Sequence, residues 1–350
     1  MFQKIRRKFE GDAPPPKGAV PGSAPSGQMP RVVTTDASRP AAIMSDNPTI
    51  VLDHVSKWYG DLVAVSDLSF SIGPGVTALL GPNGSGKSTS LKMICGLLGP
   101  STGTVTIDGL PARGDPKAYK NLGVVLDIEQ VYPYLSGREF VRMNALLQKL
   151  PDPDAATERA LATVEMTDAA NRKVGGYSKG MRQRIKLAGA LVHDPNVILM
   201  DEPLNGTDPE QRAHMIRLMW ELGRQGKTLL VSSHVLSEVE RFAENIIVII
   251  NGKLAAAGNY RTIRERIDNH PHVVRLGSPE PRKLASALVT LPQISSVRID
   301  KDGRLFVETG EVRDFYKMVP RLAKQHDVRL TELQAADESL ESVFSYLVER

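Results

Sequence analysis

The sequence has little cysteine and no long hydrophobic run. Cys95 is the one cysteine in 350 residues, which excludes an intrachain disulfide and a thiolate metal cluster. The longest unbroken apolar run covers only Ile246–Ile250, whereas a membrane-spanning helix needs about 20 apolar residues. The first ten residues, MFQKIRRKFE, lack the apolar stretch of a secretory signal. We therefore expect a cytoplasmic protein that does not cross a bilayer by itself.

Net charge is also small, and it is unevenly distributed. The whole chain carries a formal charge of +4, of which residues 1–46 contribute +3 with seven Lys or Arg against four Asp or Glu. The remaining part is nearly neutral, which gives no support to a nucleic-acid-binding surface, so no nucleic acid is expected as a partner. A content of 41% hydrophobic and 24% charged residues is typical of a globular protein.

Residues 1–46 have the composition of a linker. Eight of the 24 prolines lie in residues 1–48, with Ser, Gly and Ala between them. Such a segment buries too little apolar surface to offset its ordering entropy, which predicts a disordered tail. Its opening residues combine Phe2, Ile5 and Phe9 with four basic side chains, so contact with an anionic membrane surface stays open beside a solvated tail. The solvated tail is favoured because one short basic stretch anchors weakly.

The folded sequence begins near Thr49 and has an α/β pattern. Early strands at hairpin spacing are followed by strands that alternate with helices, which predicts an α/β core with an antiparallel edge. Strands are expected at 49–55, 68–72, 76–81, 103–109, 121–126, 196–201, 228–233 and 245–252. Helices are expected at 87–98, 137–149, 154–164, 179–193, 209–225 and 235–243.

A second, smaller unit of α+β type is expected over residues 263–350, after a larger α/β domain over 47–262. Its strands are expected at 272–276, 295–300, 304–309 and 328–335, and its helices at 281–291 and 311–326. This βαββαβ order is that of a ferredoxin-like split unit. Pro320 should bend the second helix.

A closing helix is expected at 339–349, and it carries an apolar stripe of Leu340, Val343, Phe344 and Leu347. The open sheet face of the second unit should also need a cover, for which a partner copy, the first domain or a small ligand are alternatives. Packing against a partner copy or the first domain is favoured, because no cluster of convergent polar residues marks a pocket. We expect the second unit to be an accessory domain that contributes no residue to the reaction.

Residues 81–88 match the phosphate-binding pattern G-x-x-x-x-G-K-[ST]. The pattern follows an expected strand and opens an expected helix, as its chemistry requires. Glycines let backbone N–H groups close around a polyphosphate, Lys87 supplies a positive charge, and the Ser88 hydroxyl suits Mg²⁺. The residues expected to bind nucleotide here are Gly81, Pro82, Asn83, Gly84, Ser85, Gly86, Lys87, Ser88 and Thr89.

Two carboxylates end the apolar strand at 196–201. Asp201 suits a water-mediated or otherwise indirect contact with Mg²⁺, and Glu202 lies one residue beyond it, where it can polarise an attacking water. An acidic turn that merely caps a strand would be the better interpretation if this segment stood alone. The phosphate loop in the same chain favours the catalytic interpretation.

Together with segment 177–184, YSKGMRQR, these residues resemble the ATP-binding cassette (ABC) ATPases. The segment lies 23 residues before Asp201, counted from Ser178, and looks like the family's signature motif. The resemblance covers about residues 49–260, rests on six ordered motifs, and implies a P-loop fold with a mixed sheet, an antiparallel β edge and a helical signature subdomain. It also assigns adenine stacking to Tyr59, signature contacts to Ser178 and Gly180, the D-loop aspartate to Asp208, and the γ-phosphate switch to His234.

One position departs from the family pattern. A Gln that ligates Mg²⁺ and senses the transmembrane partner is usual where this chain has Asp127. A carboxylate still suits the metal, so the resemblance assigns Mg²⁺ to Ser88, Asp201 and Asp127.

The resemblance implies hydrolysis of ATP, with Mg²⁺, between two cassettes. Glu202 and His234 would be catalytic, and a facing cassette, either a second copy or a paralogue, would supply Ser178 and Gly180. The motion would drive a separate transmembrane permease subunit from the inner face of the cell membrane, and the branch looks like the exporters.

Two rivals stay open: a soluble ABC ATPase acting in translation or DNA repair, and a regulatory cassette without turnover. A single phosphate loop and the lack of a long heptad run argue against the first rival. The presence of Glu202 and His234 argues against the second.

Overall fold

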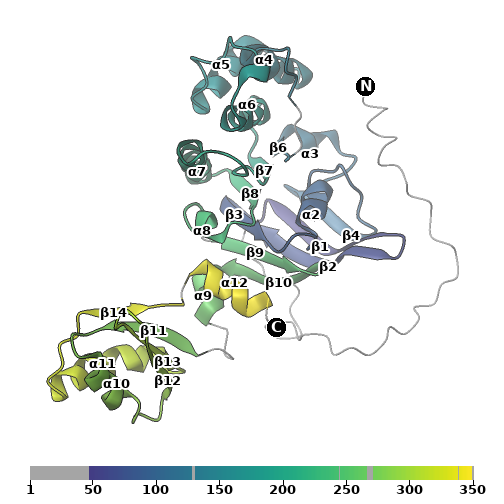
Figure 1. Cartoon of the computed structure of the whole chain (residues 1–350). Coiled ribbons are helices and arrows are strands. Elements are labelled where there is room, and N and C mark those ends of the chain that lie inside the picture. Colours follow the sequence, from purple (N-terminus) through teal and green to yellow (C-terminus); the bar gives the residue numbers. More distant parts are fainter. Residues whose placement is uncertain (1–46, 128–130, 244, 266–270, 338, 349–350) are drawn as a thin grey trace, which may run out of the picture. The chain divides into compact units, whose positions relative to one another are not determined.

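The structure is a computed structural model that describes residues 47–127, 131–243, 245–265, 271–337 and 339–348 (Figure 1). In these residues the strands form three sheets, two of four strands and one of six. The tail expected at 1–46 lies outside the described residues.

The first sheet is antiparallel and has the order β2-β1-β4-β5. Its strands are β1 (Ile50–Tyr59), β2 (Leu62–Ile72), β4 (Thr102–Ile107) and β5 (Leu110–Pro111). β1 continues beyond its predicted end at residue 55, because β2 pairs with it as far as Leu62 opposite Tyr59. The sheet confirms the antiparallel part of the fold that the sequence predicts.

The second sheet is mixed, with the order β10-β9-β3-β8-β7-β6. Its strands are β3 (Gly75–Leu80), β6 (Leu122–Val125), β7 (Val197–Asp201), β8 (Thr228–Ser232), β9 (Asn245–Ile250) and β10 (Lys253–Asn259). All neighbours are parallel except β10, which runs antiparallel to β9. β7 and β8 are buried throughout, as expected for parallel strands covered on both faces. The residues that follow β3, β7 and β8 therefore gather at one edge.

The helices of this part are α2 (Lys87–Ile94), α3 (Pro116–Lys120), α4 (Gly137–Leu147), α5 (Pro153–Thr163), α6 (Lys179–Leu191), α7 (Pro209–Arg224), α8 (Leu236–Val239) and α9 (Tyr260–Glu265). α4, α5 and α6 pack on one another and form the helical subdomain. α2 ends four residues earlier than predicted, because Gly96 has φ 71° and leaves the helical conformation. α8 is one turn long, not the nine-residue helix predicted at 235–243. α3, α9 and β10 were not predicted.

The third sheet is antiparallel throughout and has the order β12-β13-β11-β14. Its strands are β11 (His272–Gly277), β12 (Ile294–Ile299), β13 (Leu305–Thr309) and β14 (Glu332–Ala335). α10 (Pro281–Leu288) and α11 (Val312–Gln325) share one hydrophobic cluster with its strands. Pro320 lies inside α11, which continues for five more residues and buries Leu322 and Ala323. β14 begins four residues later than predicted.

Polar side chains of the third sheet pair with one another. Arg275 donates from Nε to Glu332, at 2.8 Å, and from Nη2 to Gln334, also at 2.8 Å. The guanidinium of Arg298 lies 5.1 Å from the ring centroid of Phe306. These contacts pair side chains within the sheet, and the expectation that its open face needs a cover stays a prediction.

The closing helix, α12 (Leu340–Val348), packs on the part of the chain that contains the first two sheets. Leu340 and Val343 are fully buried in the same hydrophobic cluster as Val239 and Tyr260. The backbone N–H of Leu340 also donates to Glu240, just after α8. The predicted apolar stripe is therefore present, and residues of α8 and α9 contact it.

Candidate active site

The phosphate-binding pattern forms a tight loop between β3 and α2. A Cβ on Gly81 would lie 2.1 Å from the carbonyl oxygen of Ile249, and one on Gly86 would lie 2.7 Å from that of Ala64. Gly86 has φ 105° and precedes α2 without a side-chain cap. The first N–H groups of α2 therefore lack a capping side chain and are available to an anion. The loop crest at Pro82, Asn83 and Gly84 is exposed.

Lys87 lies within this loop. Its side chain is 7% exposed, and Nζ donates to the carbonyl oxygens of Gly81 at 2.7 Å and Pro82 at 3.2 Å. Burial lowers the pKa of Lys87, and the charges of Glu202 and Asp201 oppose that shift. Removing a charge from water is costly, so the ammonium gains from a polyanion in the loop. The ammonium of Lys87 is thus a partly desolvated cation that lies inside the loop.

Asp201 joins three elements at the edge of the second sheet. Its Oδ1 accepts hydrogen bonds from Ser232 Oγ of β8 at 2.6 Å and from Ser88 Oγ of α2 at 3.4 Å. Asp201 and Ser232 are register partners of the parallel β7–β8 pair. Ser88 and Asp201 therefore lie together, and their oxygens form a donor set that suits Mg²⁺.

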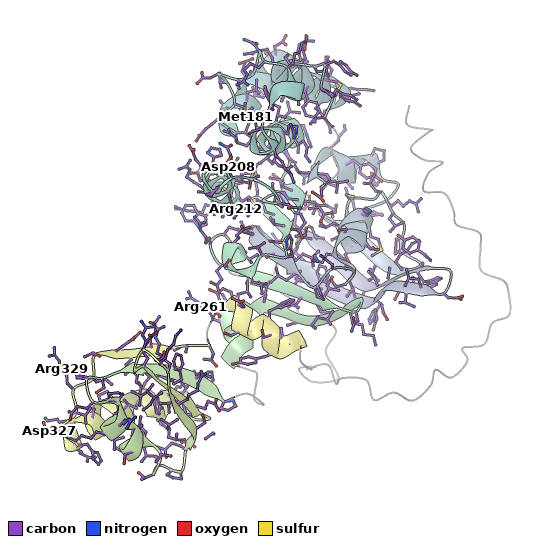
Figure 2. The ribbon with its side chains drawn as sticks, viewed as in Figure 1. Met181, Asp208, Arg212, Arg261, Asp327 and Arg329 are labelled. Carbon is purple, nitrogen blue, oxygen red and sulfur yellow. The ribbon has the colours of Figure 1, made fainter. Side chains whose placement is uncertain are left out.

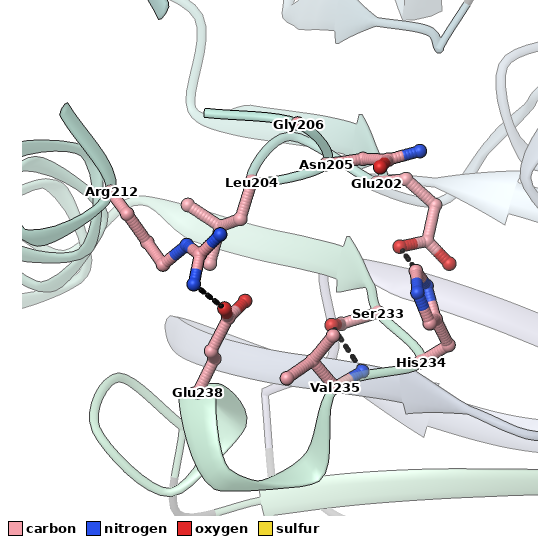
Figure 3. Close-up of a pocket in the computed structure, with 9 residues that line it drawn as sticks. All are labelled: Glu202, Leu204, Asn205, Gly206, Arg212, Ser233, His234, Val235 and Glu238. Atoms are coloured by element: carbon pink, nitrogen blue, oxygen red, sulfur yellow. Dashed lines mark hydrogen bonds and ion pairs between the residues drawn. The ribbon is translucent and has the colours of Figure 1, made fainter. Parts of the chain in front are cut away.

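Glu202 has a left-handed backbone conformation, with φ 49°. Its N–H donates to Ser232 Oγ at 2.9 Å, and its Oε2 lies 2.8 Å from His234 Nδ1 (Figure 3). Because one serine bonds both Asp201 and the next backbone N–H, it holds the backbone of Glu202 next to Asp201. Glu202 and His234 also line a hollow of about 80 Å³.

Three polar positions in this region were not predicted: Ser232, and the pair Arg212 and Glu238, which line the same hollow as Glu202. A serine directly after the apolar run at 229–231 is a usable signal for Ser232. The pair depends on a contact between residues 26 positions apart, for which the sequence has no local signal.

Ser178, Gly180 and Asp208 lie where α6 and α7 begin. Ser178 Oγ accepts from Met181 N–H at 3.2 Å, and an Asp208 oxygen accepts from Gln211 N–H at 2.9 Å, so each caps its helix. A Cβ on Gly180 would lie 2.7 Å from the side chain of Gln211. In the part of the chain that the structure describes, no hydrogen bond or ion pair joins these residues to the Lys87 loop.

Tyr59 and Asp127 have neighbours other than Asp201 and Glu202. Tyr59 ends β1, is 47% exposed, and has the ammonium of Lys57 5.2 Å from its ring centroid. Asp127 is exposed and faces a hollow shared with the signature helix, lined by Lys179, Arg182, Gln183, Lys186 and others. No cluster of three His, Cys, Asp or Glu that could hold a metal occurs within the described ranges, so the structure does not bring Asp127 into one.

The chain is similar to known ATP-binding proteins of transport systems. Residues 65–205 match the ABC transporter family. The Nod factor export ATP-binding protein I of Burkholderia orbicola is 36% identical over 247 residues, which cover 67% of this chain and 78% of that protein. The chain belongs to the ABC transporter family. It is an ATP-binding subunit of this family and an ATPase.

One further relative and one solved structure are similar to this chain. The linearmycin resistance ATP-binding protein of Bacillus subtilis is 29% identical over 303 residues, covering 85% of this chain and 97% of that protein. A solved dimeric ATP-binding cassette, in a post-hydrolysis state with ADP and phosphate, matches with a TM-score of 0.55 and 26% identity. That match covers 60% of this chain and 98% of the solved one. The fold agrees with that of this family.

Proposed function

We propose that this cassette hydrolyses ATP at an interface with a second cassette and thereby drives export through a separate transmembrane permease. The observation that supports this most strongly is the hydrogen-bonded series from Ser88 through Asp201 and Ser232 to Glu202 and His234. It places an oxygen pair for a metal, a carboxylate for water and a histidine on one edge of the sheet, next to a loop for polyphosphate.

In this proposal the loop residues 81–89 bind the phosphates of ATP, and Tyr59 stacks on adenine. Ser88 and Asp201 would hold Mg²⁺, with Asp127 as a further ligand, and the metal would neutralise charge on the phosphates. Ser85 supports this fit, because its buried Oγ has no hydrogen-bond partner among the described residues and adjoins Gly81. An oxygen of the bound nucleotide is the partner that it lacks.

Glu202 orients and deprotonates the water that attacks the γ-phosphorus, and ADP and phosphate leave. His234, 2.8 Å from Glu202, holds that carboxylate and contacts the γ-phosphate. Ser178, Gly180 and Asp208 serve the site of the facing cassette, a copy or a paralogue. Their lack of bonds to the loop of their own chain, within the described residues, supports this assignment.

Export as the direction of transport rests on the relatives named for Nod factor export and linearmycin resistance. Each described helix is too short or too polar to span a bilayer, so the proposal includes a separate membrane subunit and a peripheral position on the inner face of the membrane. We also propose the division into residues 47–262 and an accessory ferredoxin-like domain at 263–350, with the sheet order of β12-β13-β11-β14 in its support. Its last helix, α12, packs back on the cassette and does not belong to the core of the third sheet.

Exchange of Glu202 for Gln tests the assignment of the base. Glu202→Gln keeps the shape of the side chain and removes its basicity, so we expect turnover to fall roughly 10²- to 10⁴-fold while ATP binding persists. Steady-state release of phosphate and equilibrium binding of a fluorescent ATP analogue measure the two effects. Glu221→Gln, an exposed change on α7, is the matched control and should behave as wild type. Turnover like wild type in Glu202→Gln would refute the base assignment.

A further inference from the structure

One guanidinium joins two segments on either side of the hollow in Figure 3. Arg212, in the first turn of α7, contacts Glu238 of α8 from Nη1 at 2.8 Å, and its Nη2 donates to the carbonyl oxygen of Thr207 at 3.1 Å. Thr207 directly precedes Asp208, and Glu238 follows His234 by four positions. Arg212 therefore links the turn that ends in Asp208 with the segment that carries His234. Figure 2 labels Arg212 and Asp208, which both lie at the start of α7.

Burial gives this link its strength. The side chain of Glu238 is 9% exposed and that of Arg212 is 34% exposed. A carboxylate removed from water to this extent requires a charged or hydrogen-bonding partner, and loss of the partner is strongly destabilising. The planar guanidinium fixes the directions of both of its bonds, which a lysine would not do. The distance between the two segments is thus set by a stiff connection.

A short chain of bonds extends from the pair to the reacting groups. The N–H of Glu238 donates to the carbonyl oxygen of Val235 at 3.2 Å, and the N–H of Val235 donates to Ser233 Oγ at 3.1 Å. His234 lies between Ser233 and Val235 in the chain, and its Nδ1 is hydrogen-bonded to the carboxylate of Glu202. α8 is only four residues long, so the ion pair of one side chain, Glu238, strongly restrains where the helix lies.

On the other side, the Thr207 hydroxyl donates to the Leu204 carbonyl oxygen at 2.7 Å and closes the turn. Leu204, Asn205 and Gly206 of this turn line the hollow with Glu202. Both ends of the pair therefore border the space next to the carboxylate.

We propose that Arg212 and Glu238 form a positioning pair for ATP hydrolysis, which holds His234 in place relative to the turn that ends at Asp208. This inference rests on the proposed function, because it assumes that His234 and Glu202 act on ATP. The pair touches neither phosphate nor water. It acts on the rate through the placement of His234.

Replacement of the whole pair separates positioning from stability. Arg212→Met or Glu238→Met alone leaves one buried charged group without its partner, and we expect a lower melting temperature and a lower kcat. The double variant Arg212→Met/Glu238→Met replaces the pair by apolar side chains of similar length, a change that is often neutral or stabilising. We expect it to regain the melting temperature and to keep a kcat lowered roughly ten- to hundredfold, with unchanged affinity for a fluorescent ATP analogue.

The experiment uses the full-length chain with Mg²⁺ and ATP, and compares kcat, KM and melting temperature. The matched control is Arg275→Met/Glu332→Met, which removes the ion pair of the third sheet and should leave kcat unchanged. A double variant at Arg212 and Glu238 that recovers kcat together with the melting temperature would overturn the proposal. The same holds for single variants with wild-type kcat.

If the double variant does not fold, Glu238→Gln tests the proposal instead, because glutamine keeps the shape of the glutamate side chain and one acceptor oxygen. Charge-assisted hydrogen bonds are about twice as strong as neutral ones, so we expect kcat to fall roughly fivefold without a change in ATP affinity. A wild-type kcat in this variant would overturn the proposal. His234→Ala is run in parallel: turnover like wild type there refutes the proposed function itself, whatever the pair does.

Discussion

Ser232 offers a sharp test of how the two carboxylates are held. It is fully buried at the end of β8, donates to Asp201 and accepts from the Glu202 N–H. Ser232→Ala removes one hydrogen bond to a charged acceptor and one to a backbone donor. A bond to a charged group contributes about 1.5–3 kcal/mol and a neutral one about 0.5–1.5 kcal/mol, so we expect a loss of about 2–4.5 kcal/mol in the free energy of unfolding.

Thermal unfolding measures this loss, and the expected decrease in melting temperature is about 5–10 °C. Ser71→Ala is the matched control, because Ser71 is a buried strand serine whose Oγ has no hydrogen-bond partner among the described residues. Its removal should change stability by less than about 0.5 kcal/mol. Turnover should fall roughly tenfold or more in Ser232→Ala, since the left-handed backbone at Glu202 loses its anchor. Equal melting temperatures for the two variants would refute the reasoning.

Three further predictions use other parts of the chain. Lys87→Ala should abolish binding of a fluorescent ATP analogue, because it removes the cation that the loop encloses, and unchanged affinity would mean that the phosphates bind elsewhere. Burial raises the pKa of Cys95 to about 11, so only about 0.1% is thiolate at pH 8. Ellman's reagent should therefore react with the denatured chain and hardly with the native one, and rapid labelling of native protein would contradict this. Leu340→Ala should lower the free energy of unfolding by about 2–5 kcal/mol while ATP binding persists, and an unchanged melting temperature would show that α12 does not anchor the chain.

The parts of the site that could be predicted are those with a local signal. The loop at 81–88 needs glycines, a lysine and a serine at fixed spacing between a strand and a helix, and all of these are adjacent in the sequence. Asp201 and Glu202 likewise follow directly from an apolar strand. The structure brings Ser88 to Asp201 and His234 to Glu202 as the sequence interpretation requires.

Ser232 and the Arg212–Glu238 pair could not be predicted in the same way, because strand register and helix packing create them. Ser232 can donate to Asp201 only because β7 and β8 run parallel and place these two residues opposite each other. Arg212 reaches Glu238 only since α7 and the short α8 border the same hollow. Residues of this kind carry no spacing pattern, although a polar residue at the end of an apolar strand is a reason to look for its partner.

The C-terminal helix shows a different limit of sequence reasoning. The spacing of Leu340, Val343 and Leu347 predicts an apolar stripe and the need for a covering surface, and both are correct. Periodicity contains no information about which surface that is, because Leu or Val side chains pack equally well against any complementary apolar patch. In the structure α12 contacts α8 and α9 and continues the hydrophobic cluster of the cassette, while the third sheet has its own core. A chain that ends near residue 264 therefore loses both the third sheet and a piece of the cassette's own core, so its lower stability would report on α12 before it reports on the accessory domain.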